Sequence, residues 1–450
     1  MQNSPTHPAP PLDRSAAEVR PSEGSALGWR WAPFWILFHV ALWPAPGYAE
    51  AVLVLGALVA IYRLARSRFT DGTRLLSHQA WALTSVLFFA YWLPEAVSAL
   101  DAVDVPRAMR EAAADLRYLP FLWLAASAVA NDRGRRITFG GLAVIMLVWT
   151  LDAVLQVFTG TSPLFFGIDT LKQAISGRGM CSAEESAAVD RLSGILGPCN
   201  LKLGLVLASL SPFVLYWAGR RAGMLGWLLA AGAMGIVVLM AGARAAWITF
   251  GLALLFSGWR LLGWRRLIAV FAFGAVTLAV LAYGSPQVRE RVERTGQMLA
   301  ANQQGVDTAL SGRGRIWGAA MCMVRAHPVN GVGARGFREA FAGCDPEPGE
   351  LAAWGEGPAL HAHQLVLEVL SETGIFGLLM WLAGAAMAWR AWKFADEPSR
   401  EQARPAMLAL AITVFPFNTH LAFYSTFWGG LTLLLAALYA GSLLAAPARK

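Results

Sequence analysis

The sequence predicts an all-α polytopic membrane protein with about twelve transmembrane helices and a large, partly helical periplasmic loop. Of its 450 residues, 56% are hydrophobic and only 15% are charged. A soluble globular protein of this length carries considerably more charge, and apolar stretches of membrane-spanning length recur along most of this chain.

Twelve apolar segments account for most of the chain. A window of about 19 residues, which suits a transmembrane helix, locates each of them. They lie near residues 29–46, 48–65, 79–99, 117–131, 137–158, 201–219, 223–242, 244–259, 267–284, 373–392, 405–422 and 425–446. Before the fourth segment, residues 101–116 have the pattern of an amphipathic helix that lies along the membrane surface.

Basic residues in the short loops predict the orientation. If every segment crosses once, these loops fall on one side, which the positive-inside rule assigns to the cytoplasm together with both termini. The residues are Arg63, Arg66, Arg68, Arg74, Arg133, Arg135, Arg136, Arg220, Arg221, Arg260, Arg265, Arg266, Arg390 and Lys393, with Arg449 and Lys450 at the C-terminus. Topology therefore explains the net charge of +8 better than a nucleic-acid partner does.

The same pattern divides the chain into four parts. Residues 1–28 contain no apolar core, so they are predicted to form a disordered cytoplasmic tail and not a cleaved signal peptide. Residues 29–284 are expected to hold helices one to nine, with a periplasmic loop at 159–200. Residues 285–362 are expected to form a periplasmic loop domain, and residues 363–450 the last three helices and the cytoplasmic C-terminus.

The second periplasmic loop is predicted to fold into a small cap. Charged helical stretches such as Val288–Leu299 alternate in it with glycine-rich turns such as Asn330–Gly336. Loops of this length usually carry function or remain disordered, and this one is too patterned for a tether.

All four cysteines lie on the predicted periplasmic face. Cys181 and Cys199 belong to the first loop, and Cys322 and Cys344 belong to the second. In an oxidising compartment we expect a disulfide within each loop, which would close about 20 residues and stabilise each loop by about 3 kcal/mol. The alternative is that the thiols remain unpaired.

Several arginines lie at or near the periplasmic end of the predicted helix bundle, where the positive-inside rule predicts few basic residues. A guanidinium group presents a planar fork of donors that matches phosphate oxygens, so several in a water-poor cleft would bind a diphosphate. The alternative is that each one snorkels or pairs with an acid such as Asp190, Glu290 or Glu293. The arginines are Arg191, Arg244, Arg313, Arg315, Arg325, Arg335 and Arg338.

His363 is the candidate catalytic residue, because it ends the long polar insert and opens another apolar segment. A histidine with an ordinary pKa near 6.5 can accept a proton from a hydroxyl at neutral pH, as a general base does. His361 competes for this role, and a purely structural histidine is the other interpretation. A metal site lacks a third ligand beside the two histidines. The sequence contains neither a Walker motif nor a dinucleotide fingerprint, so no cofactor is predicted.

The chain resembles the bacterial O-antigen ligases, which join a surface polymer to lipid A-core. They share a superfamily with O-antigen polymerases and with oligosaccharyltransferases that glycosylate pilins. The resemblance covers most of the chain and rests on the span pattern and three local motifs. These are Arg191 with Gly197–Asn200 (GPCN), Gly312–Trp317 (GRGRIW) followed by His327–Phe337 (HPVNGVGARGF), and His363-Gln364 followed after nine residues by Gly374 and by Gly377.

The resemblance implies a GT-C-like, metal-independent and cofactor-free glycosyltransferase of lipopolysaccharide biosynthesis, with its site on the periplasmic side of the inner membrane. It would transfer O antigen from undecaprenyl diphosphate to lipid A-core oligosaccharide, with membrane lipids as its surroundings. His363 would be the base, and Arg191, Arg244 and Arg313 would bind the diphosphate. Ala243 departs from the hydroxyl residue that relatives often carry before this second arginine. Residues with possible secondary roles are Arg335, Arg315, His361 and Asn200.

Three alternatives stay open at the level of sequence. An O-antigen polymerase would use the same donor, and its pattern of an arginine, ten residues and a glycine occurs once, from Arg325 to Gly336. A protein O-oligosaccharyltransferase would differ in its acceptor. A transporter of lipid-linked glycans would need charges in mid-membrane. Here the charged residues lie mostly at one end of the predicted bundle and not within the membrane, although Asp152 lies within a predicted span.

Overall fold

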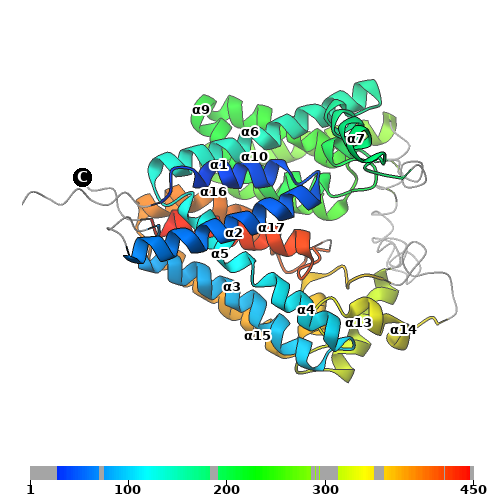
Figure 1. The fold of residues 1–450 in the computed structure, drawn as a ribbon. Helices are drawn as coiled ribbons and strands as arrows, with labels where there is room; N and C mark the ends of the chain where they lie inside the picture. Colours follow the sequence, from blue (N-terminus) through cyan, green and yellow to red (C-terminus); the bar gives the residue numbers. More distant parts are fainter. Residues whose placement is uncertain are drawn as a thin grey trace, which may run out of the picture.

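The computed structural model describes residues 28–69, 75–182, 191–284, 289, 293, 313–348, 359–419 and 421–445. Within these ranges every regular element is a helix (Figure 1). The predicted tail before Gly28 and most of the predicted helical stretch Val288–Leu299 lie outside them.

Ten helices run alongside one another and form the body of the molecule (Figure 1). Seven of those described are long and apolar enough to cross a membrane, namely α2 (Pro46–Phe69), α3 (His78–Ser98), α6 (Asp132–Thr159), α9 (Leu203–Met240), α10 (Arg244–Gly284), α15 (Leu365–Phe394) and α17 (Thr426–Leu443). The other three are α1 (Ala32–Ala41), α5 (Tyr118–Ser127) and α16 (Glu397–Thr413).

Two of the long helices change direction within their length. In α9 the backbone leaves helical geometry at Ala222 and Gly223, and a Cβ added at Gly219 would lie 3.8 Å from Cβ of Trp227. Residues eight apart in a straight helix are about 12 Å apart, so the chain doubles back here. Helix α10 breaks in the same way at Gly263.

The breaks allow α9 and α10 each to cover two of the predicted apolar segments. The predicted number of twelve membrane crossings is nevertheless not confirmed. Helices α1 and α5 contain 10 residues each, whereas about 20 are needed to cross the hydrocarbon core. The number of crossings stays a prediction, as does the four-part division of the chain.

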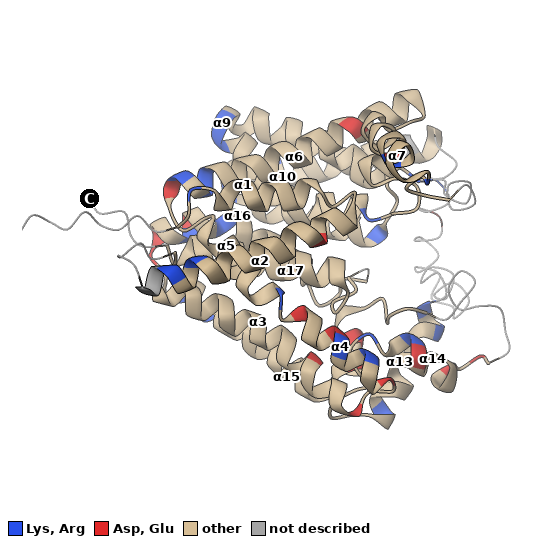
Figure 2. Ribbon diagram, in the orientation of Figure 1, with Lys and Arg blue, Asp and Glu red and all other residues tan. Residues whose placement is uncertain are grey.

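One end of the bundle is rich in arginine, as the loop pattern predicts (Figure 2). Arg220, in the turn of α9, donates to the carbonyl of Glu401, and Arg260 pairs with the carboxylate of Glu401 at 2.8 Å. We call this the basic end. Charges of both signs gather at the opposite end, which we call the site end because His363 lies there.

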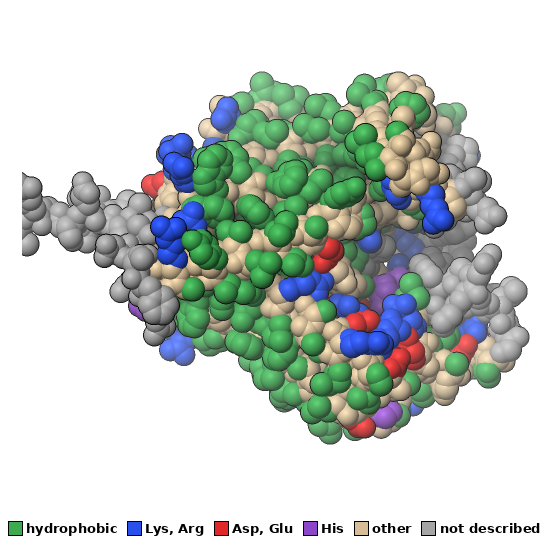
Figure 3. All heavy atoms as spheres, viewed as in Figure 1, with side chains coloured by type: hydrophobic (Ala, Val, Ile, Leu, Met, Phe, Trp, Pro, Cys, Tyr) green, Lys and Arg blue, Asp and Glu red, His purple; other side chains and the backbone are tan. Residues whose placement is uncertain are grey.

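Apolar side chains form both the core and much of the outer surface. The first half of α9 and nearly all of α17 are buried at the centre. Figure 3 shows hydrophobic side chains over the outside of the bundle between its two ends. Exposed aromatic and aliphatic side chains on so many helices fit a surface that faces lipid.

Short elements cover the site end. They are η1 (Ala99–Asp101), α4 (Val105–Asp115), α7 (Pro163–Ser176), η2 (Gly194–Leu196), α13 (Arg313–Ala326) and α14 (Phe337–Cys344). Disulfides join Cys181 to Cys199 and Cys322 to Cys344, so both expected pairs are present. Helix α4 occupies most of the predicted amphipathic segment.

Helix α7 was not predicted. It begins after Ser162, whose hydroxyl accepts from the N–H of Phe165, and Pro163 occupies the first turn. Both residue types are typical of a helix start. Asp152, the charged residue within a predicted span, accepts hydrogen bonds from the Ser162 hydroxyl and from the N–H of Leu164. Its role in the structure is therefore to hold the start of α7.

Candidate active site

The site is built around a break in α15. Gly374 has φ of 64°, and a Cβ added there would lie 2.2 Å from the carbonyl oxygen of Val329. The loop after α13 crosses α15 at this point, and a Cβ at Gly331 would lie 2.3 Å from backbone carbon of Glu372. Only glycine permits two backbones to approach so closely.

Backbone hydrogen bonds fix this crossing. The N–H groups of Ile375 and Phe376 donate to the carbonyls of Pro328 and Val329. In the other direction, the N–H of Val332 donates to the carbonyl of Ser371. The crossing therefore attaches α13, which begins with Arg313, to α15, which follows His363.

The two neighbours His363 and Gln364 have different roles: Gln364 caps α15, and His363 is the candidate catalytic residue. Gln364 is the N-cap of α15, where its side chain accepts from the N–H of Leu367 and donates to the carbonyl of Pro416. His363 is 4% exposed and has φ of 52°. This left-handed conformation is rare for a residue with a side chain and often marks a functional site.

His361 supports His363 directly. Nδ1 of His361 accepts a hydrogen bond of 3.2 Å from the backbone N–H of His363, and the two ring centres are 3.9 Å apart. The carboxylate of Glu368 lies 3.4 Å from the same Nδ1. Burial, together with the nearby charges of Arg313 and Arg338, lowers the pKa of His361 to about 4. His361 is therefore neutral near pH 7.

Arg313 is the first residue of α13 and is half-buried. Its guanidinium lies within 3.5 Å of the Thr419 hydroxyl, and its Nε has no hydrogen-bond partner among the described residues. One face of α13 packs on α14 through a small core. The Cys322–Cys344 disulfide also joins these two helices.

The structure brings Arg191 and Arg244 near Arg313. Gly242, with φ of 71°, turns the chain between α9 and α10, so that Arg244 begins α10 at the site end. Arg191 is exposed and precedes η2, which is held on α6 by a 2.7 Å hydrogen bond from the Gly194 N–H to Gln156.

These arginines repel one another. Burial lowers the pKa of Arg313 to about 10, and the charges of Arg244 and Arg191 contribute to the shift. Burial is the larger cause of this shift, and the two neighbouring positive charges add to it. Figure 3 shows the surface hollowed at the site end, with histidine and basic side chains visible in the recess. These residues place three guanidinium groups near the neutral, half-buried His361 and the buried His363.

Arg315 and Arg335 do not join this cluster. Arg315 pairs with both carboxylate oxygens of Asp345, at 2.7 and 2.6 Å. Arg335 pairs with Asp115 at 2.9 Å and with Glu111 at 3.3 Å. The partners differ from the acids suggested by the sequence. These two arginines, for which the sequence suggested possible secondary roles, are paired with carboxylates within the protein.

Two further polar residues lie near the site. Arg338 lies on α14, affects the pKa of His361, and has no hydrogen-bond partner for its Nε within the described ranges. Sequence reasoning counted it among the external arginines but did not select it, because no motif contains it. The buried Oδ1 of Asn200 likewise has no hydrogen-bond partner in the described part of the chain.

Comparison with known proteins agrees with this geometry. Residues 229–382 match the family model described as O-antigen ligase. The match supports membership of this chain in the O-antigen ligase family. The matched range contains Arg244, Arg313 and His363 and the glycine crossing, whereas Arg191 precedes it. A search of curated proteins finds no match.

Membership indicates the general class of activity. The family comprises glycosyltransferase-like O-antigen ligases and polymerases, and it implies substrates that are lipid-linked polysaccharides. The apolar helices and the family together indicate a membrane protein.

Proposed function

We propose that this O-antigen ligase family member is a metal-independent, inverting ligase of the bacterial inner membrane. It transfers O antigen from undecaprenyl diphosphate to lipid A-core oligosaccharide at the periplasmic end of the bundle. The observation that carries the proposal is the grouping of Arg191 and Arg244 with Arg313, which in turn lies close to the half-buried His361 beside the buried His363.

Each arginine has a role on the donor. The three guanidinium groups bind the diphosphate, whose negative charge relieves their mutual repulsion. When the bond between the anomeric carbon and the diphosphate oxygen breaks, negative charge grows on the leaving group. Donors fixed in advance at that position stabilise the transition state more than the ground state.

His363 acts on the acceptor. Its imidazole takes the proton of an acceptor sugar hydroxyl while that oxygen forms a bond to the anomeric carbon. The bond to the diphosphate breaks on the opposite side, so the configuration at carbon is inverted and undecaprenyl diphosphate leaves. The proton remains on His363 until it passes to solvent in the recess.

His361 and Glu368 position this base. Because Nδ1 of His361 accepts from the backbone N–H of His363, the neutral form of His361 maintains the left-handed turn. Protonation of His361 would remove that acceptor. We therefore assign His361 to positioning and His363 to proton transfer.

The test is transfer by the purified protein reconstituted in liposomes. It receives undecaprenyl-diphosphate glycan with and without lipid A-core, in the presence of EDTA. We expect product on lipid A-core, insensitive to EDTA, and a loss of about 10²- to 10⁴-fold in His363→Ala. His78→Ala, at the basic end, is the matched control.

Other outcomes would point elsewhere. Elongation of the lipid-linked glycan without acceptor would identify a polymerase, and product on a pilin substrate a protein glycosylating enzyme. Full activity in His363→Ala would exclude His363 as the base. Movement of the glycolipid across the membrane without a covalent product would favour a transporter.

A further inference from the structure

Helix α7 exposes several large hydrophobic side chains at the surface of the described part of the protein. None of its residues is buried. Leu164, Leu171 and Ile175 are 37%, 61% and 70% exposed, and Phe166 is exposed as well. Leu164, Leu171 and Ile175 are spaced as on one face of a helix, and Ile168 between them is half-buried against the core of the protein.

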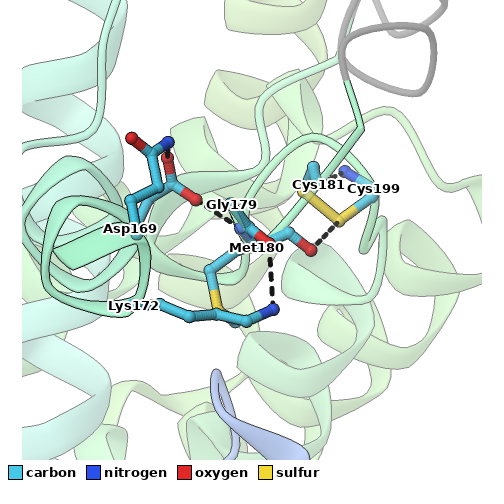
Figure 4. The surroundings of a disulfide bond; sticks show 7 residues. Asp169, Lys172, Gly179, Met180, Cys181 and Cys199 are labelled. Carbon is cyan, nitrogen blue, oxygen red and sulfur yellow. Dashed lines mark hydrogen bonds between the residues drawn. A yellow bond between two sulfur atoms is a disulfide. The ribbon is translucent and has the colours of Figure 1, made fainter. Parts of the chain in front are cut away.

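The opposite side of α7 is fully engaged with the protein. Figure 4 shows Asp169 and Lys172 turned toward the following hairpin, where Asp169 accepts from the N–H of Met180. The amine of Lys172 donates to the carbonyl of Gly179 at 2.9 Å. Cys181, one residue further on, is joined to Cys199. The polar groups of α7 therefore hold the segment that carries Cys181.

Exposed apolar side chains also occur on the last turns of α6, the helix that precedes α7. Leu151, Leu155 and Phe158 form a stripe on the last turns of α6 and are 60%, 49% and 82% exposed. Gly160 and Ser162 then turn the chain into α7. In Figure 1, α7 is seen almost end-on at the site end, whereas α6 and α2 run across the picture.

We propose that α7 lies in the outer surface of the lipid bilayer, with Leu164, Leu171 and Ile175 among the lipid chains. A helix across the bundle axis, with one apolar and one polar side, has the geometry of an interfacial anchor. Through the disulfide between Cys181 and Cys199, this anchor sets the height of Arg191 above the membrane. That last step rests on the proposed function, because it concerns where the donor diphosphate is held.

Photo-crosslinking in nanodiscs tests the anchor without using enzymatic activity. Benzoylphenylalanine replaces Leu171 or Ile175 in the full-length protein, in discs of phosphatidylethanolamine and phosphatidylglycerol. We expect phospholipid adducts, detected by intact-protein mass, at both positions. Thr170 is exposed on another side of the same helix, and the same substitution there should give little adduct.

The outcomes separate the alternatives. No lipid adduct at 171 and 175, or equal adducts at 170, would overturn the proposal. Crosslinks to a second copy of the chain would assign the face to a protein interface instead. Leu171→Glu should then raise the KM for the lipid-linked donor more than it lowers kcat, with Thr170→Glu as control. If the protein were not a transferase, the crosslinks would still form and only this kinetic effect would be missing.

Discussion

Arg313 and Arg335 lie at the same end of the bundle, yet their surroundings are opposite. Arg313 is close to two other arginines, and its pKa is lowered. Burial alone would lower the pKa of Arg335 as well, but Tyr91 and Asp115 raise it above its usual value. A cation among carboxylates stabilises the fold, whereas a cation among cations is tolerated only where an anion binds.

Whether an arginine is paired with carboxylates or surrounded by other arginines distinguishes a structural arginine from a functional one. The residue type alone does not make this distinction. Arg335 ties α4 to the segment before α17, through Asp115 and the carbonyl of Tyr424, and its own N–H donates to Glu372 of α15. Arg313 makes one long hydrogen bond to Thr419. The guanidinium of Arg335 is paired within the protein, whereas that of Arg313 retains N–H donors that can bind a ligand.

Removing the structural arginine should have the largest effect on stability. Arg335→Gln leaves the buried carboxylate of Asp115 with Arg117 as its remaining charged partner, and breaking a buried ion pair by removing one member typically costs about 3–5 kcal/mol. Thermal unfolding in detergent, followed by circular dichroism, should show a clearly lower midpoint. An unchanged midpoint would mean that Arg335 is not a structural tie.

Removing the functional arginine should affect catalysis and not stability. Arg313→Gln removes a diphosphate donor, so we expect kcat to fall by about 10²- to 10³-fold. Its unfolding midpoint should stay equal or rise, because a repulsive charge is lost. Steady-state transfer assays measure kcat for Arg313→Gln and for Arg315→Gln. The second variant provides the contrast, because we expect it to lose stability before it loses transfer activity. If Arg313→Gln were destabilised but transferred glycan at the normal rate, Arg313 would be a structural arginine and not a functional one.

Acid should destabilise the protein through His361. Its pKa is about 4 in the folded state against about 6.5 in an unfolded chain. The unfolded chain therefore takes up a proton first as the pH falls, and up to about 3 kcal/mol of stability is lost between pH 6.5 and 4. The unfolding midpoint should fall through this window, and less so in His361→Gln. An identical pH dependence in both proteins would argue against a buried neutral His361.

Much of the fold follows from local signals in the sequence. Apolar segments locate the long helices, and Gly223 and Gly263 allow the turns between neighbouring segments. The loop motif around Gly331 and the glycine after His363-Gln364 are explained by one backbone crossing. Helix α7 could have been found from Ser162-Pro163 and the spacing of its aliphatic residues, but the amphipathic pattern was overlooked within a loop.

The partners of the arginines could not be predicted, because they depend on distant parts of the chain. Asp115 is 220 residues from Arg335, and Asp345 is 30 residues from Arg315. Spacing does not indicate which arginine meets a carboxylate after folding. For the same reason, Arg338 on α14 gave no local signal of its approach to His361.

Binding of glycan-free undecaprenyl diphosphate in nanodiscs tests most directly whether the clustered arginines form the donor site. The shift in unfolding temperature is measured against ligand concentration for the wild type, Arg313→Gln and Arg315→Gln. We predict a saturable stabilisation of the wild type, its loss in Arg313→Gln, and an unchanged apparent Kd in Arg315→Gln. Equal affinity in the wild type and Arg313→Gln would contradict the assignment.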